Sequence, residues 1–254
     1  MLGGTQMLSD TIKKEFEEKL NGERLDIKFY PRENRGDILA SVYITIGNLI
    51  RINNALMKIG SNGLYLQMPS FKDKDDHWKT FCFPTPDFHK TLNEIALAAF
   101  EWEKESFISL NEDNDFFAKF ETTVHLLNSN QKNKPKAIAT FTLPEVASFT
   151  AIRIMDDFEQ APWYILPGFK QKRFQDNRWI KYSYFSPTLQ AKPVFRRSVL
   201  RAYCDTQKEH GVFPVHQNPE KVLSTEYDQP QDLQSIYRML EQQKEELEKH
   251  LRQK

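Results

Sequence analysis

The stretch ILASVYITI, residues 38–46, places apolar side chains at alternate positions. Such alternation is typical of a β-strand that buries one face and leaves the other polar. Further short runs of the same kind surround it, and turn residues such as Gly60-Ser61-Asn62-Gly63 separate them. These runs are LDIKFY, LIRI, ALMKI and GLYLQM, between residues 25 and 68. This part of the chain therefore predicts an antiparallel meander of short strands.

A helix is expected directly after these strands. Pro84-Thr85-Pro86-Asp87 ends the strand pattern, and Asp87 is a candidate N-cap. From there to about Trp102 the apolar residues fall on one helical face. The first unit of the chain is therefore a sheet followed by a helix.

The same order recurs between residues 120 and 203. The strand-like runs are FETTVHLL, AIATFTL, VASFTAIRIM, PWYILPGF and RWIKYSYF, and a helix is expected from about 191 to 203. Anchor residues coincide at a separation near 100, with Trp78 beside Trp179 and Pro84 beside Pro187. The pattern predicts an internal repeat. Trp78 is expected in the core, because it lies in a strand-like run.

We therefore predict an α+β fold of two repeated small domains, each an antiparallel β-sheet followed by an α-helix. Extra helices are expected at the N- and C-terminal ends. The predicted boundaries are an N-terminal helix in 1–24, a first domain in 25–103, an acidic linker in 104–118, a second domain in 119–205, an irregular loop in 206–230 and a C-terminal helix in 231–254.

Composition narrows the class of protein. The 254 residues carry 35 basic and 35 acidic side chains, and 39% are hydrophobic, as in soluble globular proteins. No window approaches the roughly 18 apolar residues of a membrane-spanning helix, and residues 1–20 are polar and acidic where a signal peptide is apolar. We expect a cytoplasmic protein without a membrane partner.

Motifs for catalysis and metal binding are absent from the sequence. The six histidines show no metal-ligand spacing, and Cys82 and Cys204 stand far apart. There is no nucleophile elbow, and the nine glycines form no phosphate-binding loop. We therefore predict a protein that is not an enzyme, with no catalytic residues, no metal site and no cofactor.

Positive charge gathers in the second repeat. Residues 168–201 carry a net charge of +8, whereas residues 70–101 carry −2. Cations that share a surface bind phosphates, and planar side chains stack on unpaired bases. The predicted nucleic-acid-binding residues are Lys170, Lys172, Arg173, Arg178, Lys181, Lys192, Arg196, Arg197 and Arg201, with Phe174 and Tyr182 as candidate stacking residues. The alternative is that these charges form an ordinary solvated surface and that the aromatic residues alternate into the core.

Three stretches of the sequence resemble a known family. Residues 60–70, GSNGLYLQMPS, are similar to the Gly-Asn turn and Met-Pro-Ser signature of the stage V sporulation protein G (SpoVG) family, and residues 137–143 and 152–156 are similar to two of its strands. The resemblance spans about residues 25–205 in two copies, neither of which holds every motif. Phe83 and Ser186 stand where the family usually has His, and the second copy lacks the Met-Pro-Ser signature.

This resemblance implies a function. Members of the family are small dimeric bacterial proteins that bind DNA and RNA and regulate gene expression, septation and sporulation. It implies a regulator with DNA or RNA as its partner, and the tandem arrangement implies that one chain supplies both halves of the dimer. The alternative is a protein–protein interaction module that uses its sheet edges and terminal helices without nucleic acid. Sheet edges and the C-terminal helix are also candidates for self-association.

Overall fold

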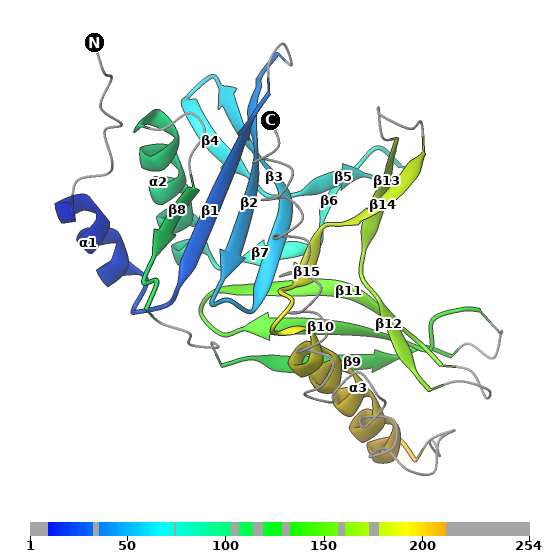
Figure 1. The fold of residues 1–254 in the computed structure, drawn as a ribbon. Helices are drawn as coiled ribbons and strands as arrows, with labels where there is room; N and C mark the ends of the chain where they lie inside the picture. Colours follow the sequence, from blue (N-terminus) through cyan, green and yellow to red (C-terminus); the bar gives the residue numbers. More distant parts are fainter. Residues whose placement is uncertain are drawn as a thin grey trace, which may run out of the picture.

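The structure, a computed structural model, describes residues 10–32, 36–73, 75–102, 107–113, 119–128, 133–156, 161–172 and 178–211. Within these residues lie three helices, α1 (Asp10–Lys19), α2 (Pro86–Trp102) and α3 (Lys192–Glu209), and fifteen strands (Figure 1). The strands pair in antiparallel fashion, so the fold is α+β as the sequence predicts. None of the described helices combines the length and apolar character that crossing a membrane requires.

The first sheet has the strand order β15-β3-β2-β1-β8, and β4 also lies beside β3. Its strands are β1 (Leu25–Pro31), β2 (Ile38–Ile46), β3 (Ile50–Gly60), β4 (Gly63–Gln67), β8 (Phe107–Leu110) and β15 (Phe185–Pro187). Helix α2 covers one face, where the ring of Phe100 lies 5.6 Å from that of Phe29. The backbone N–H of Leu66 on β4 donates to Oδ1 of Asn93 on α2 at 2.8 Å. Helix α1 packs beside α2 and β8.

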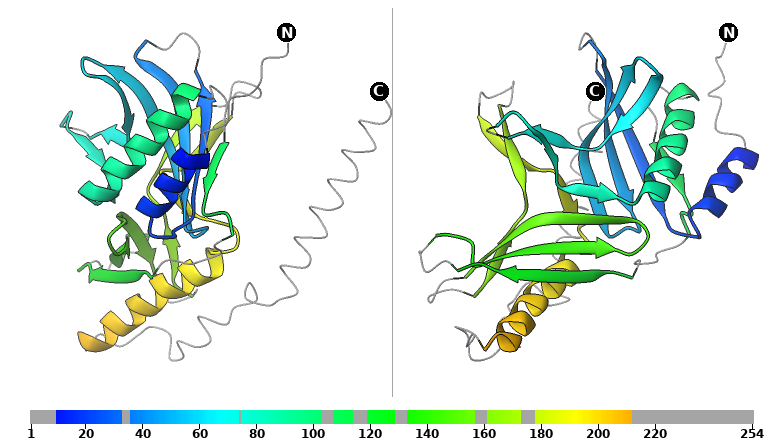
Figure 2. Two further views of the ribbon diagram at one scale, coloured as in Figure 1. Left: turned by 90° about the vertical axis from the view of Figure 1, so that its left-hand side faces the viewer. Right: turned by 180° about the vertical axis from the view of Figure 1, so that it is seen from behind.

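The second sheet has the strand order β12-β11-β10-β9, and β7 also lies beside β11. Its strands are β7 (Cys82–Pro84), β9 (Glu121–Leu126), β10 (Ala137–Leu143), β11 (Ala147–Met155) and β12 (Trp163–Ile165). Helix α3 covers one face, and its Phe195 ring lies 4.8 Å from Phe141 and 5.5 Å from Tyr164. Each sheet is thus covered by one helix (Figure 2).

Two short hairpins complete the described fold. One joins β5 (Ser70–Lys72) to β6 (Trp78–Thr80), and the other joins β13 (Gly168–Lys172) to β14 (Trp179–Ser183). They lie side by side in Figure 1. At their bases Phe71 stacks on Phe81 at 4.8 Å, and Tyr184 lies 5.2 Å from both Phe81 and Phe169. This aromatic cluster joins the two hairpins.

The two sheets exchange one strand each. Strand β7 precedes α2 in the chain but pairs with β11 of the second sheet, with Cys82 opposite Phe149. Strand β15 precedes α3 but pairs with β3 of the first sheet, with Phe185 opposite Ile52. All four side chains are fully buried, in one hydrophobic core that contains residues of both sheets. The two halves of the chain therefore share one core.

Two threonines complete the exchange, and one of them also begins a helix. Thr85 donates its backbone N–H to the carbonyl of Val146 and its hydroxyl to the carbonyl of Glu145, both at 2.8 Å. Thr188 makes the same two bonds to Leu49, at 2.9 Å, and to Asn48, at 2.6 Å. Each hydroxyl also accepts an N–H from the residue three positions later. Thr85, rather than the expected Asp87, therefore caps α2.

A β-bulge lets β3 and β11 each pair with two different strands along the same edge. Asn53 and Asn54 together stand opposite Tyr43, and Asn54 has a φ of 60°. In β11 the bulge has the same place, and Ala151 has a φ of 61°. A bulge bends its strand and increases its twist. The first part of each strand thus pairs with the exchanged strand and the last part with β4 or β12.

A buried polar network holds the C-terminal part of α3 against the end of β11. The hydroxyl of Tyr203 donates to Oδ2 of Asp156 at 2.9 Å, and Nε2 of Gln207 donates to the Tyr203 oxygen at 2.9 Å. Burial is the main reason why the pKa of Tyr203 is raised, and the neighbouring carboxylate adds to it. The hydroxyl therefore stays protonated and remains a donor.

Three predicted boundaries differ from the structure. LIRI and ALMKI form one bulged strand, β3, rather than two. The predicted acidic linker 104–118 contains β8, which pairs with β1 because Ile108 and Leu110 are apolar and buried. The predicted irregular loop 206–230 begins too early, because α3 continues to Glu209. The predicted C-terminal helix 231–254 and the start of the N-terminal helix lie outside the described residues.

The expectation for Trp78 is wrong. Its side chain is 64% exposed, because β6 belongs to a hairpin that projects from the sheet and whose strands have only three residues each. The alignment of Trp78 with Trp179 also shifts. Thr80 pairs with Ser70, the first residue of the first hairpin, and Ser183 pairs with Gly168, the first residue of the second. Thr80 therefore corresponds to Ser183, and Trp78, two positions earlier, corresponds to Lys181 and not to Trp179. The second hairpin has longer arms, which a fixed repeat length does not predict.

We expect Phe185→Ala to lower the free energy of unfolding by about 3–5 kcal/mol, because it leaves a cavity where β15 enters the first sheet. Urea denaturation followed by far-ultraviolet circular dichroism and by tryptophan fluorescence measures this. The two probes should give one coincident transition, since both sheets share a core. Leu189→Ala, at a side chain that is 51% exposed just beyond β15, is the matched control and should change little. Two separate transitions, of which only one shifts, would contradict the shared core.

Candidate nucleic-acid interface

Helix α3 holds four of the predicted nucleic-acid-binding residues. Lys192, Arg197 and Arg201 are exposed, and Arg196 is half-buried near Tyr164 of β12. Arg201 has one weak ion pair, with its Nε 3.8 Å from a carboxylate oxygen of Asp205. The opposite side of the helix packs on the second sheet. The exposed side of α3 therefore presents a row of cations.

The hairpin β13–β14 holds the other described cations. Lys170 and Lys181 stand directly opposite each other in the register, and both are exposed. Trp179, two positions before Lys181, belongs to the same hairpin face and is 66% exposed. Arg178 is exposed as well. The hairpin thus combines a lysine pair with an exposed indole. The sequence had left open whether this tryptophan lies in the core.

Not every predicted residue of this hairpin is described. Lys172 occupies the register position opposite Trp179, and its side chain is outside the described part. Arg173 and Phe174 lie outside the described residues altogether. Tyr182 is paired with Phe169 on the hairpin face opposite the lysines, where the two rings stack at 5.7 Å. The structure therefore separates Tyr182 from the cations beside which it was predicted to act.

The hairpin and α3 do not form one surface. In Figure 1 and in the right-hand view of Figure 2, β13–β14 lies on one side of the second sheet and α3 lies on the other side. The reason lies in the chain path, since β15 crosses to the first sheet between them. The predicted basic residues therefore lie on two surfaces, a basic hairpin (Lys170, Arg178, Trp179 and Lys181) and a basic helix face (Lys192, Arg196, Arg197 and Arg201).

The first hairpin is internally neutralised. Nζ of Lys72 lies 2.8 Å from Asp76, and Nζ of Lys79 lies 2.6 Å from Asp73. The bond from Lys79 is the main reason why the pKa of Asp73 is lowered. Among the residues that the structure describes, no carboxylate stands within ion-pair distance of Lys170 or Lys181. The two hairpins thus have the same place in the fold, but the first is neutralised and the second is basic.

Asp73, Asp75 and His77 approach one another in the first hairpin, with potential ligand atoms within 4.8 Å. Oδ1 of Asp73 already accepts the backbone N–H groups of both Asp75 and His77 at 2.9 Å. These bonds, with the Lys79 pair, explain the cluster as a turn that holds the hairpin together.

Sequence reasoning missed a further surface on the first sheet. On the face away from α2, which faces the viewer in Figure 1, aromatic and basic side chains line an open groove of about 870 Å³. We call it the tyrosine face and define it by Lys28, Tyr30, Tyr43, Arg51 and Phe107. The signal was present in the alternation of β1 and β2, because Tyr30 and Tyr43 stand at outward positions among the polar residues Lys28, Ser41 and Thr45.

Cations outnumber acids at the tyrosine face. Nζ of Lys28 lies 5.2 Å from the centre of the Tyr30 ring. Arg32 donates from Nε to the hydroxyl of Ser41 and from an Nη to Oδ1 of Asn54 at 3.1 Å. Asp26 is the acidic residue among the described residues that line the groove, and its carboxylate already accepts a hydrogen bond from Nε of Arg24 at 3.2 Å.

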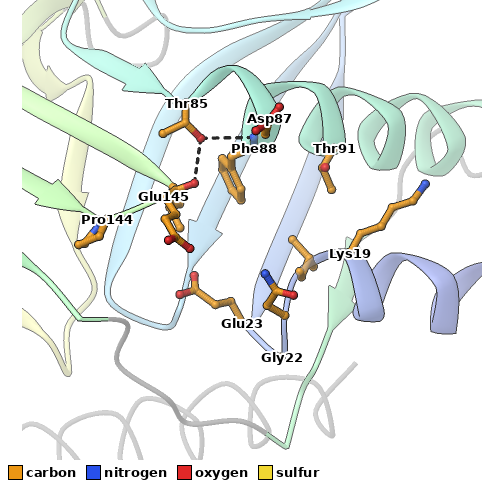
Figure 3. Close-up of a pocket in the computed structure, with 12 residues that line it drawn as sticks. Lys19, Gly22, Glu23, Thr85, Asp87, Phe88, Thr91, Pro144 and Glu145 are labelled. Atoms are coloured by element: carbon orange, nitrogen blue, oxygen red, sulfur yellow. Dashed lines mark hydrogen bonds between the residues drawn. The ribbon is translucent and has the colours of Figure 1, made fainter.

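A second groove lies at the seam between the two halves of the chain. It has a volume of about 780 Å³ and is lined by residues near the start of β1, the start of α2 and the turn between β10 and β11. The carboxyl groups of Glu23 and Glu145 point toward each other there (Figure 3). Oε2 of Glu23 is buried without a hydrogen-bond partner among the described residues. Burial first, and then the charge of Glu145, raise the pKa of Glu23.

We expect Glu23→Gln to stabilise the protein by about 1 kcal/mol near pH 8, because it removes a half-buried charge without a partner. A carboxyl whose pKa is raised by folding stabilises at low pH and loses that contribution as pH rises through its folded value. The advantage of the variant should therefore shrink as pH falls toward the ordinary glutamate pKa of 4.5. Thermal and urea unfolding across this range test it, with Asp87→Asn at the exposed rim as control. A gain that is independent of pH would contradict the electrostatic cause.

Comparison with known proteins agrees with part of this description. No curated protein matches the chain. The match to a family model begins before β1 and ends with α2, so it covers the first predicted copy and leaves the second, residues 119–205, without the same support. Residues 23–102 of this chain match the family model SpoVG.

Proposed function

We propose that this chain is a non-enzymatic, nucleic-acid-binding regulatory protein that is built as a fused SpoVG-like pseudo-dimer. DNA or RNA is its partner, and the basic hairpin and the basic helix face contact phosphates. The SpoVG match over residues 23–102 supports a role in regulation, of the septation and sporulation kind that the family resemblance implies.

The reciprocal exchange of β7 and β15 supports the pseudo-dimer. Both strands pair with the first part of the long bulged strand of the opposite sheet, and both lead through a Pro-Thr pair into the covering helix. A related pair of subunits that exchange an identical element gives this arrangement. Here the two partners would be the halves of one chain.

The contrast between the two hairpins carries the nucleic-acid assignment. In the first, the lysines are paired with aspartates of the same turn. In the second, Lys170 and Lys181 lie side by side and exposed, next to the indole of Trp179. A lysine pair that attracts an anion, beside a planar side chain, suits a nucleic-acid backbone and its bases.

Charge reversal tests this assignment. We expect Lys170→Glu with Lys181→Glu, and separately Arg197→Glu with Arg201→Glu, to weaken binding of the full chain to both single-stranded and duplex DNA. Each lost phosphate contact should flatten the plot of log affinity against log salt by about one unit. Fluorescence anisotropy at several salt concentrations measures affinity and slope together.

Lys72→Glu with Lys79→Glu in the first hairpin is the matched control, because these lysines already face aspartates. It should leave the salt slope unchanged. Equal effects of all three charge reversals would contradict a specific basic surface. No binding by the unaltered chain would favour the alternative, a protein-interaction module, and a pull-down that is insensitive to nuclease would then identify its partner.

A further inference from the structure

We propose that the tyrosine face of the first sheet is a second nucleic-acid site, which takes unpaired bases of a single strand by stacking. The inference rests on the proposed nucleic-acid binding, and it assigns a different surface from the basic hairpin and the basic helix face. Its ligand is single-stranded DNA or RNA, because paired bases expose no ring face to a side chain.

Two of the three aromatic side chains of this face are exposed. Phe107, on the edge strand β8, is 56% exposed, and Tyr30, on β1, is 45% exposed. The other face of the same strands already packs on α2, so these rings add nothing to the core. Large aromatic side chains that project from a sheet into an open groove are more typical of ligand binding than of stability.

The rings stand on three neighbouring strands. Phe107 stands on β8 directly opposite Lys28 on β1, and Tyr30 lies two positions further along β1. Tyr43 on β2 meets the Tyr30 ring edge-on at 5.3 Å. Lys28 and Tyr43 thus already contact the Tyr30 ring, whereas no ring contact among the described residues involves Phe107. Stacking of bases on such rings tolerates any base sequence.

Cations surround the rings. Lys28 and Arg51 are exposed and line the groove, and hydrogen bonds hold Arg32 at its margin. The charges of Arg32 and Arg51 both act on Tyr43, since they lower its pKa against the larger effect of burial. Positive charge beside open rings is complementary to a polyanion with planar bases, which favours a single-stranded nucleic acid over an apolar peptide.

The face extends toward the basic hairpin. Tyr182, on the hairpin face away from the lysines, is close enough to Tyr43 to raise its pKa. Tyr182 is 39% exposed and stacks on Phe169.

The second sheet lacks two of these side chains on its corresponding face. Thr140 stands opposite the β11 bulge as Tyr43 stands opposite the β3 bulge. Ser148, beside the exchanged strand β7, takes the place that Arg51 has beside β15. Tyr43 and Arg51 are therefore a property of the first half of the chain, although exposed Phe83, His125 and Arg153 stand on the corresponding face of the second sheet.

Two variants of the full chain test the inference. Phe107→Ala and Tyr43→Ala should each weaken binding to a short labelled oligothymidine and oligouridine about 10-fold, which is within the usual contribution of one stacked base. Binding to duplex DNA should stay unchanged, as should the salt slope, because no phosphate contact is lost. Tyr43→Phe should restore single-strand affinity, since it keeps the ring.

Phe83→Ala is the matched control, because Phe83 is 48% exposed on a short edge strand and lies outside the groove. It should leave single-strand affinity unchanged. Near-normal binding by Phe107→Ala and Tyr43→Ala, while the charge reversals still weaken it, would overturn this inference alone. Equal losses on duplex and single strand, or a change in sedimentation that indicates self-association through this face, would overturn it too. No binding by the unaltered chain would overturn both proposals.

Discussion

The exchange of β7 and β15 is the contact on which the rest of the structure depends. Each strand has only three residues, and a strand of that length contributes few hydrogen bonds. Its strength comes from burial, since Cys82 and Phe185 are inaccessible to solvent, and from the threonine that follows. Thr85 and Thr188 bond to the hairpin turn of the opposite sheet, and Thr85 also caps the covering helix α2. Loss of one exchange would therefore displace both a strand and a helix.

Much of this fold was predictable from local pattern. Alternation located β1, β2, β10 and β11, because each buries one face, and the apolar face of α2 located its end at Trp102. The exchange was not predictable from the same pattern, because the sequence of a three-residue strand has the same alternation whichever sheet the strand joins. Strand β8 was hidden by the acidic residues around it, although Ile108 and Leu110 are buried.

The candidate sites divide in a similar way. Charge counting found the basic hairpin and the basic helix face, because local charge density is visible in a sequence. It did not find that β15 separates them, which depends on the path of the chain. The tyrosine face was missed because alternation was used to find what is buried, and Tyr30 and Tyr43 occupy outward positions of β1 and β2. Phe107 stands on β8, which was predicted as part of a linker. The size of these side chains was the available signal.

Both exchanged strands belong to one polypeptide. Two separate subunits that trade strands fall apart on dilution, whereas here the connection through residues 107–121 keeps the partners at a high effective concentration. Folding of the interlocked core is therefore unimolecular, and the fraction of chains with a folded core is independent of how many copies a cell contains. The two halves are also different stretches of sequence, so one half can lose a charge or gain a ring without the same change in the other half.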